Sequence, residues 1–563
     1  MDSSFVQAPV QVPRLSGFDK SHQNLLSTKV GTITPILVDE LIPGAKASCK
    51  LAISCSLPPL ASETYMRVQL KVEAFFVPFR LLAGSFESWF TDQPKKFAPY
   101  SWSGTSITPT ERKGLLPVIG AFNGASDVSG SNLLAELFSR SGSLGDYLGF
   151  KEGDAGVLDS EYLTALPFLA YHRIYHDWYR NSLVQSDVFL PPTYNNSNSI
   201  SPASQNPVAG TAPYDFFGFN GAINAFSNYE ALLLADGVYL YELRQRNFGL
   251  DYFTTATPQA QQGSPEVVSF STSGSTGQFS IAALRGANSL QQFKERNNLL
   301  GNLYVEQVYG RYGVRPSDGI AQRSLFIGSG VFDVYSKGIY ESSTGVNGSS
   351  ETLGTNNPFG GVPGARYGSA YASGQEFIVS GFEAKEPGYL MIMATLVPKV
   401  TYSTGIRRYL RHYIASGSLA DLANPILQNV GPQPIYSYEL NGQTGSHIFG
   451  FTDRYAEFKT LEDELHGEVR DGYSLQSFAA QRSFDPSTSL NQEINSAFLQ
   501  IPTNYLDQVF AVNSEVSRLG CWLDCYFDYK VAQPLAKYAL PSLQDPAYEH
   551  GKTIVVNRGG FKL

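Results

Sequence analysis

Charged residues are scarce in this sequence, and positive charge is scarcer than negative charge. Asp, Glu, Lys and Arg make up 16% of the 563 residues, below the roughly one quarter that is usual for soluble proteins. The sequence contains 41 Lys and Arg residues and 50 Asp and Glu residues, which gives a net charge of -9. A surface of this average charge repels a polyphosphate backbone, so any contact with nucleic acid must be local.

Long apolar runs and a secretory signal are also missing. The most apolar stretch, from Tyr389 to Pro398, is far shorter than the ~20 residues that a membrane-spanning helix needs. The first ten residues, MDSSFVQAPV, contain no basic segment followed by an apolar run, which is the pattern of a secretory signal. The sequence therefore predicts no membrane insertion and predicts synthesis in a cytoplasm.

Only four cysteines are present, in two close pairs, Cys49 with Cys55 and Cys521 with Cys525. Four thiolates could in principle hold a zinc ion. However, the segment CWLDCYFDY alternates as a strand does, which places the two sulfurs of the second pair ~13 Å apart at ~3.3 Å per residue. One ion cannot bridge that distance. We therefore expect four free thiols that pack as small apolar groups, as in a reducing compartment.

Motifs for the common catalytic and metal sites are incomplete. His172 and His176 have helical metal-binding spacing, but no Glu follows His172, so hydrogen-bonded helix histidines are the favoured interpretation. HGKT at His550 resembles the end of a phosphate-binding loop, yet Pro546 stands where the first glycine of that loop belongs. No GxSxG serine elbow occurs, although Ser-His-Asp triads also exist without one. We expect no catalytic residue, no metal and no cofactor.

The acidic run LEDELHGE, from Leu461 to Glu468, contains four carboxylates within eight residues. Its side chains could serve as the acid and nucleophile of a glycosidase, or as calcium ligands. A solvated turn is the favoured interpretation, because runs of charge usually lie on exposed faces. A β-sandwich carbohydrate-binding or glycoside-hydrolase protein therefore remains the alternative function.

Glycine, proline and aromatic residues are abundant instead. The 52 Gly and 32 Pro residues favour many short strands joined by long turns over a helical bundle. Aromatic residues make up 13% of the sequence, and such residues are enriched both in cores and in protein interfaces. No internal repeat or linker divides the chain, so we predict one mainly β domain over residues 1–563.

Alternating and apolar segments predict the strands. In residues 65–76, apolar side chains from Met66 to Ala74 alternate with Arg67, Gln69, Lys71 and Glu73, which indicates a half-buried strand. The segment that begins at Gly388 is apolar on both faces, as expected for a strand that is covered on both sides. Further strands are predicted at 33–38, 47–57 and 521–531.

Two helices and three long loops interrupt this pattern. Helices are predicted over 166–183, with Pro167 in the first turn, and over 281–300, with a possible continuation after Gly301. Residues 101–160, 193–228 and 342–374 are rich in Gly, Ser and Asn and are predicted as exposed loops. The helices do not alternate with the strands, which favours an antiparallel sandwich with enlarged loops over a parallel fold.

The C-terminal tail is the best candidate for contact with DNA. It carries Lys552, Arg558 and Lys562 with no acid after Glu549, and Phe561 could stack on a base. Three cations add little against the overall negative charge, so a plain surface tail is the alternative. A sequence-specific DNA-binding regulator would need a basic patch that the composition does not show.

Several blocks of the sequence resemble the major capsid protein of gokushovirus-type microviruses, which are small phages with circular single-stranded DNA. The blocks follow the order of that family: FFVPFRLL (75–82), LPFLAYHRIYHDWYRN (166–181), DYFTTATPQAQQG (251–263), FSIAALR (279–285), ERNNLLGNLYVEQVYGRYGV (295–314), EPGYLMIMATLVPKVTYSTG (386–405), DRYAEFK (453–459), HGEVR (466–470) and LAKYALPSL (535–543).

This resemblance implies an eight-stranded antiparallel jelly roll with long loop insertions. It further implies a T=1 icosahedral shell around single-stranded DNA, a small basic DNA-packaging peptide, a receptor on the host-cell surface, and a place in the virion. Two positions depart from the family pattern. Only residues 264–278 stand where relatives carry a long insertion that builds threefold protrusions, so these protrusions are either absent or rebuilt from 193–228. Phe79 replaces a common Asn.

Overall fold

The computed structural model describes most of the strands, the helices and the segments that connect them. The described residues are 7–12, 15–62, 64, 67–83, 86–91, 101–102, 105–106, 116–120, 134–151, 162–189, 225–226, 234, 236–266, 281–341, 366–412, 423–442, 447–484, 493–511, 520–535 and 552–557. No helix within these ranges has the length and apolar character that crossing a membrane requires.

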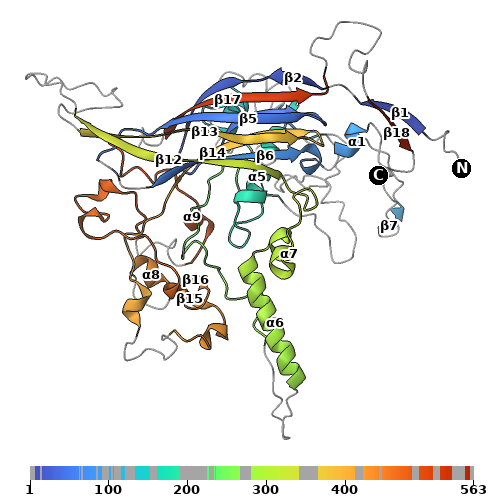
Figure 1. Cartoon of the computed structure of the whole chain (residues 1–563). Coiled ribbons are helices and arrows are strands. Elements are labelled where there is room, and N and C mark those ends of the chain that lie inside the picture. The colour runs from blue at the N-terminus through green and yellow to red at the C-terminus, as the bar shows by residue number, and fades with distance from the viewer. Residues whose placement is uncertain are drawn as a thin grey trace, which may run out of the picture.

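One curled antiparallel sheet forms the upper part of the molecule (Figure 1). Its nine strands are β2 (Ser16–Asp19), β3 (His22–Thr28), β4 (Thr34–Leu41), β5 (Lys46–Ser56), β6 (Val68–Pro78), β12 (Leu325–Glu341), β13 (Arg366–Glu383), β14 (Gly388–Pro398) and β17 (Cys521–Gln533). Five of these strands, β4, β5, β6, β14 and β17, lie where the alternating and apolar segments predicted them. The mainly β class is therefore confirmed.

The strand order joins the two ends of the chain. β2 and β3 pair with opposite ends of β17 and so occupy one position in the sheet. From that position the order runs β17, β5, β13, β12, β6, β14, β4. If β2 and β3 are counted as the first of eight strands, the first strand lies beside the eighth, β17, and the second strand, β4, lies beside the seventh, β14. Two interleaved Greek keys produce such an order, and no parallel pair occurs in this sheet.

The core explains why β14 is apolar on both faces. Leu390, Ile392, Ala394 and Leu396 point into the larger core, which lies inside the curl of the sheet together with residues of β5, β6 and β17. Tyr389, Met391 and Met393 of β14 belong instead to a second core outside the curl, where helix α5 packs. The strand is therefore buried on both sides, as its sequence predicted.

Helix α5 (Leu166–Ile174) ends earlier than the sequence predicts. A wider turn continues it from Tyr175 to Tyr179, where the N–H of Arg180 donates to the carbonyl of Tyr175. Arg180 is extended, and the side chain of Asn181 accepts the N–H of Leu183. The predicted helix over 166–183 is thus wrong for its last four residues, because Asn181 competes for the backbone there.

Helix α6 (Ile281–Leu300) has the predicted bounds, and α7 (Tyr304–Tyr312) follows it. Gly301 separates the two with a φ of +86°, a conformation that favours glycine. The carboxylate of Glu306 accepts the N–H of Leu303 and so caps the start of α7. The predicted continuation after Gly301 is therefore confirmed as a separate helix.

The loop predicted over 342–374 is wrong for residues 366–374, which form the start of β13. This part of β13 pairs with both β12 and β5. Its glycines and serines resemble a loop in sequence, but Gly374 lies against the ring of Phe332, where a Cβ atom would come within 2.4 Å of the ring. Close packing, rather than a turn, requires the small residue.

Short elements complete the structure. The predicted loop 101–160 contains β7 (Ser101–Trp102), β8 (Thr105–Ser106), β9 (Val118–Gly120), α2 (Leu134–Ser139) and α3 (Leu144–Leu148), and β11 (Ala225–Phe226) is the described part of 193–228. The others are β1 (Gln7–Val12), α1 (Phe86–Phe90), β10 (Tyr162–Thr164), β15 (Gln433–Tyr436), α8 (Ser437–Asn441), β16 (Ile448–Thr452), α9 (Ser496–Leu499) and β18 (Lys552–Asn557).

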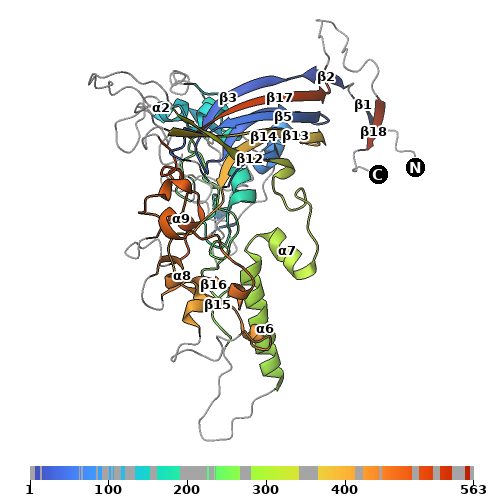
Figure 2. The same cartoon turned by 60° about the vertical axis from the view of Figure 1, so that its left-hand side comes forward.

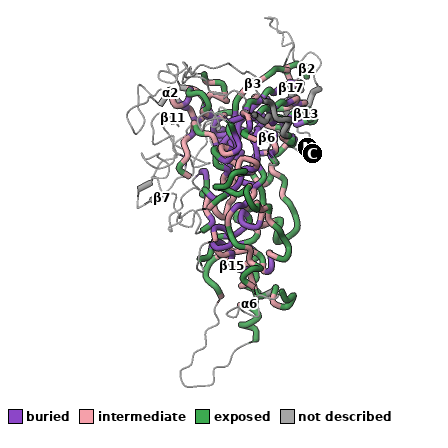
Figure 3. Tube along the Cα trace, turned by 90° about the vertical axis from the view of Figure 1, so that its left-hand side faces the viewer, coloured by how far each residue is buried: buried purple, intermediate pink, exposed green. Residues whose placement is uncertain are grey.

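A lobe lies below the sheet in the views of Figures 1 and 2. We define the lower lobe as helices α6 and α7 together with residues 401–484, which include α8, β15 and β16. Buried chain is concentrated in the sheet and in the upper part of this lobe, whereas α6 is coloured mainly as exposed (Figure 3). The lobe therefore differs from the sheet in how completely its surface is covered.

Candidate assembly surface and acidic pocket

Helix α6 exposes an apolar surface that the described part of the chain does not cover. Of its 20 residues, only Asn297 and Asn298 are buried. Large apolar side chains with substantial exposure lie along α6 and α7: Ile281, Leu284, Leu290, Phe293, Leu299, Tyr304, Tyr309 and Tyr312. Patches of this kind mark protein interaction sites on soluble proteins.

The two halves of α6 differ in how they are held. The C-terminal half is anchored, because the side-chain amide of Asn298 donates to Thr257 and Gln259, and Lys294 forms an ion pair with Glu266. In residues 281–290, every residue except the half-buried Ala287 is exposed. Most of the stability of helices in proteins comes from packing of an apolar face. The N-terminal half of α6 has little such packing within the described residues.

Residues 401–484 carry a second group of exposed apolar side chains in the lower lobe. They are Ile406, Tyr409, Leu410, Ile426, Val430, Ile448, Phe458, Leu461, Tyr473 and Leu475. Leu461 is 82% exposed, and it is the grouping of such side chains, rather than any single one, that indicates an interaction surface. Several of these side chains surround a pocket, so the two features form one surface.

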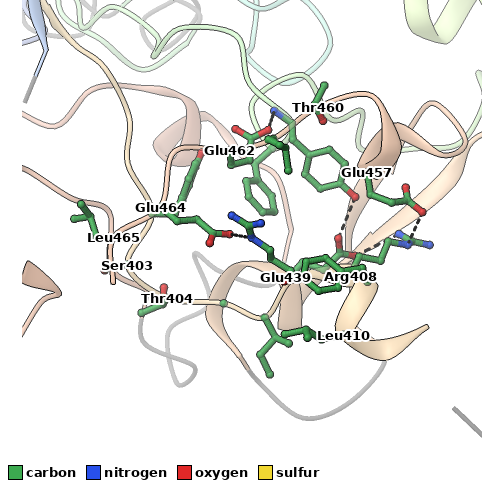
Figure 4. A pocket seen from close by; sticks show the side chains of 18 of the residues that line it. Ser403, Thr404, Arg408, Leu410, Glu439, Glu457, Thr460, Glu462, Glu464 and Leu465 are labelled. Atoms are coloured by element: carbon green, nitrogen blue, oxygen red, sulfur yellow. Dashed lines mark hydrogen bonds and ion pairs between the residues drawn. The ribbon is translucent and has the colours of Figure 1, made fainter. Parts of the chain in front are cut away.

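The pocket has a volume of about 570 Å³ and is lined by apolar side chains, four carboxylates and three arginines. Figure 4 shows the four carboxylates together with Arg408. Ile406, Tyr409, Leu410, Phe458 and Leu461 contribute apolar lining. The carboxylates come from α8 and from the segment after β16: Glu439, Glu457, Glu462 and Glu464. The chain thus brings together residues that are far apart in the sequence.

Three of the four pocket carboxylates are neutralised by arginines. Arg407 Nε lies 2.6 Å from Glu464 Oε1. Arg408 lies 3.3 Å from Glu439 and 3.5 Å from Glu457. Burial nevertheless raises the pKa of Glu439, although the charge of Arg408 and hydrogen bonds oppose the rise. These ion pairs fix the interior of the pocket.

Glu462 is the exception. Its carboxylate accepts the backbone N–H of Tyr252 at 3.1 Å and forms no ion pair with any described residue. Burial, and then the nearby charge of Asp251, raise the pKa of Glu462 to about 7. A partly buried carboxylate without a counter-ion is well placed to accept a cationic group from outside.

The solvated turn predicted for residues 461–468 is only partly right. Asp463 and Glu468 are exposed, but Glu462 and Glu464 line the pocket. This acidic run is the one part of the pocket that the sequence analysis singled out. Hydrolysis of a glycoside uses two carboxylates, whereas three of the four here are held in ion pairs. The arrangement therefore favours binding over hydrolysis.

The predicted DNA-contact residues are only partly described. Lys552 begins β18, which pairs with β1 so that Val12 lies opposite Lys552. The side chain of Lys552 is not described, and Arg558, Phe561 and Lys562 lie outside the described residues. DNA contact by this tail stays a prediction.

The histidines and cysteines lie where the favoured interpretations put them. Arg244 Nε donates to His172 Nδ1 at 2.9 Å, and His172 Nε2 donates to the carbonyl of Leu240. Burial and the charge of Arg244 lower the pKa of His172 well below its usual value. His176 contacts Asp177. Both are hydrogen-bonded helix histidines, as predicted. All four cysteines are free and buried.

A mainly β sandwich with a lobe that leaves large apolar surfaces uncovered defines a subunit of a larger protein assembly. Shells of viruses are built from sandwiches of this class. The chain belongs to the capsid protein (F protein) family, whose pattern matches residues 6–111 and 189–543. It is therefore a structural capsid protein.

Relatives span nearly the whole chain. The capsid protein VP1 of Chlamydia phage 1 is 24% identical over 97% of this chain and 98% of its own length. Capsid protein VP1 of Bdellovibrio phage phiMH2K is 23% identical, with 96% and 97% covered. Capsid protein VP1 of Spiroplasma virus 4 is also 23% identical, with 93% and 94% covered. The resemblance to microvirus capsid proteins is confirmed.

Proposed function

We propose that this chain is the major capsid protein of a small bacteriophage and that it assembles into a T=1 icosahedral shell around single-stranded DNA. The observation that carries this proposal is the match to phage capsid proteins over nearly the full length. The strand order, with its two interleaved Greek keys, supports one eight-stranded jelly roll over residues 1–563. The virion is then the place where the protein acts, after synthesis in the host bacterial cytoplasm.

Assembly follows from the contrast between the sandwich and the lower lobe. The exposed apolar side chains of α6, α7 and residues 401–484 lose their contact with water when subunits associate. Each specific contact needs on the order of 1,000 Å² of buried surface. Particle formation therefore depends on subunit concentration.

Packaging needs partners beyond the shell itself. A subunit with a net charge of -9 does not neutralise a polyphosphate genome. A small basic DNA-packaging peptide is the partner that supplies this positive charge, and a receptor on the host-cell surface is the partner of the outer loops. Contacts between this chain and DNA are then few and aided by aromatic side chains, with the C-terminal tail as the first candidate.

Electron microscopy of the purified full-length chain tests the shell. Closed particles of uniform size, with a matching single peak in sedimentation, are the expected result. A protein that stays monomeric at high concentration in every condition that assembles its relatives contradicts the proposal.

Carbohydrate binding is the second candidate function, and the pocket beside Glu462 is the observation that favours it. Aromatic side chains and a carboxylate on a concave surface suit a sugar. A glycan array with the wild-type protein and Glu462→Gln tests this candidate. Binding that the substitution weakens supports it, and an empty array for the wild type removes it.

A further inference from the structure

The N-terminal half of α6 combines apolar and basic character without any acid. No Asp or Glu occurs from residue 267 to residue 294, whereas Arg285 and Lys294 do occur. Lys294 is paired with Glu266, but Arg285 forms no ion pair among the described residues. The backbone at the start of a helix also carries partial positive charge. This end of α6 therefore presents exposed Ile281 and Leu284 beside an unneutralised cation.

The pocket in residues 401–484 has the complementary character. Its rim is apolar, with exposed Leu410, Phe458 and Leu461, and its interior contains the carboxylate of Glu462 without a counter-ion. Arginine next to leucine is a combination that protein interfaces favour, and its guanidinium can donate two hydrogen bonds to one carboxylate. The charge and the apolar character of the two surfaces match.

These two surfaces are kept apart within one chain. The C-terminal half of α6 is fixed to residues 257–259 by Asn298, so the helix cannot turn back as a rigid body. The free half comprises ten residues, which project about 15 Å at 1.5 Å per residue. In Figure 1, α6 forms one edge of the lower lobe, and α8, which supplies Glu439 to the pocket, lies toward the other edge. The helix of one copy is thus placed to reach the pocket of another.

We propose that the N-terminal half of α6 docks on the Glu462 pocket of a second copy of this chain, with Arg285 as the partner of Glu462. This inference rests on the proposed function and names one of the contacts that build the shell. The two surfaces differ and lie on different parts of the lobe. Repeating such a heterologous contact around a rotation axis closes a ring, as a shell requires.

Charge reversal tests the pairing directly. Arg285→Glu and Glu462→Arg are each expected to raise the subunit concentration for half-assembly at least tenfold, because each places like charges together at every copy of the contact. The double variant, Arg285→Glu with Glu462→Arg, restores opposite charges and is expected to recover most of the assembly. Sedimentation and electron microscopy measure the assembled fraction.

A matched control separates this effect from net charge. Lys385→Glu makes the same charge change at an exposed position on the turn between β13 and β14. It is expected to assemble within about threefold of the wild type. Thermal unfolding of the unassembled Arg285→Glu and Lys385→Glu subunits is expected to be unchanged, because exposed substitutions away from buried features alter stability little. The unfolding of Glu462→Arg is measured beside them, because Glu462 is partly buried and accepts the N–H of Tyr252.

Cysteine cross-linking gives a second, independent measurement. Leu284→Cys combined with Leu461→Cys is expected to form disulfide-linked multimers on oxidation, since the four native cysteines are buried. Leu25→Cys combined with Leu461→Cys is the control, because Leu25 is 70% exposed and lies on strand β3 of the sheet. The control pair is expected to give little cross-linking.

The outcomes distinguish this inference from the proposed function. Three results would overturn the contact but not the proposed shell. They are normal assembly by both single variants, failure of the double variant to recover assembly, and cross-linking no greater than that of the control. A wild-type chain that forms open oligomers with the Leu284–Leu461 cross-link, but never closed particles, supports the contact and overturns the shell. If a charge variant unfolds at a different temperature from the wild type, its assembly no longer tests the contact, and the cross-linking result decides.

Discussion

The sandwich buries its apolar side chains within one chain, whereas the N-terminal half of α6 leaves its apolar side chains exposed. In the sandwich, β14 is covered on both faces, by the core inside the curl and by α5 outside it. In α6, Ile281 and Leu284 are 66% and 50% exposed. The sandwich is therefore complete within one chain, whereas the helix is not. Substitutions in the two regions should affect different properties, namely subunit stability and assembly.

The largest expected effect lies in the sandwich. Phe168 of α5 is fully buried and makes edge-to-face contact with Phe138. Phe168→Ala should lower the free energy of unfolding of the isolated subunit by ~3–5 kcal/mol, through lost transfer energy and the cavity that remains. Denaturant unfolding measures this. Phe293→Ala on α6 is the matched variant, and a loss of less than about 1 kcal/mol is expected because Phe293 is half exposed. Equal losses would remove the contrast between the regions.

A partly buried ion pair extends the same comparison. Arg246 binds Glu73 of β6 with contacts of 2.6 and 3.0 Å, and Tyr179 donates to the same carboxylate. Arg246→Met leaves the partly buried Glu73 without its cation, and a loss of roughly 3 kcal/mol is expected. The exposed pair of Lys399 with Asp463 in the lower lobe is the control, since breaking it should cost less than about 1 kcal/mol.

The pH dependence of this pair has a definite sign. Burial alone raises the pKa of Glu73, but the hydrogen bonds and charge of Arg246 outweigh burial and leave the pKa below its usual value. A depressed pKa in the folded state adds stability above the unfolded value, near 4.3, which is lost as the pH falls through the folded pKa. The wild type should therefore lose more stability than Arg246→Met between pH 5 and strong acid. A parallel loss in both proteins would contradict this role.

The smallest expected effect is at Glu462 in the isolated subunit. Because its pKa is raised to about 7, the protonated form stabilises the fold at low pH, and this stability is lost as the pH rises through about 7. Glu462→Gln should unfold like the wild type near pH 5 and at a higher temperature at pH 8. The difference should stay below about 1 kcal/mol because the group is partly exposed. Thermal unfolding at the two pH values measures it, and a difference at pH 5 alone would contradict the assignment.

Periodicity predicted those strands in which one face is apolar and the other polar. β5, β6 and β17 alternate and were predicted, as was the two-sided β14. β12 and β13 were not predicted as strands. Gly328 and Gly330 interrupt the alternation of β12, because a Cβ atom there would meet Ile378 or Glu376 of β13. The close approach of β12 and β13 requires glycine at these positions, and the glycines remove the apolar–polar alternation by which a strand is predicted.

The pocket could not be predicted, for a different reason. Its walls come from residues near 252, 402–410, 439 and 457–470, which only the tertiary fold brings together. The run LEDELHGE marked a cluster of acids, but the sequence did not show that arginines neutralise Glu464 while Glu462 stays unpaired. Helix α6, in contrast, was predicted with its observed bounds, because its pattern is local.

Hydrogen exchange tests most directly the claim that another copy completes the surface of α6. In isolated subunits, the amides of residues 281–290 should exchange rapidly, whereas those of β17 should be protected. In closed particles, residues 281–290 should become protected as well, with β17 unchanged. Rapid exchange of residues 281–290 in the particle, or full protection in the isolated subunit, would contradict the account.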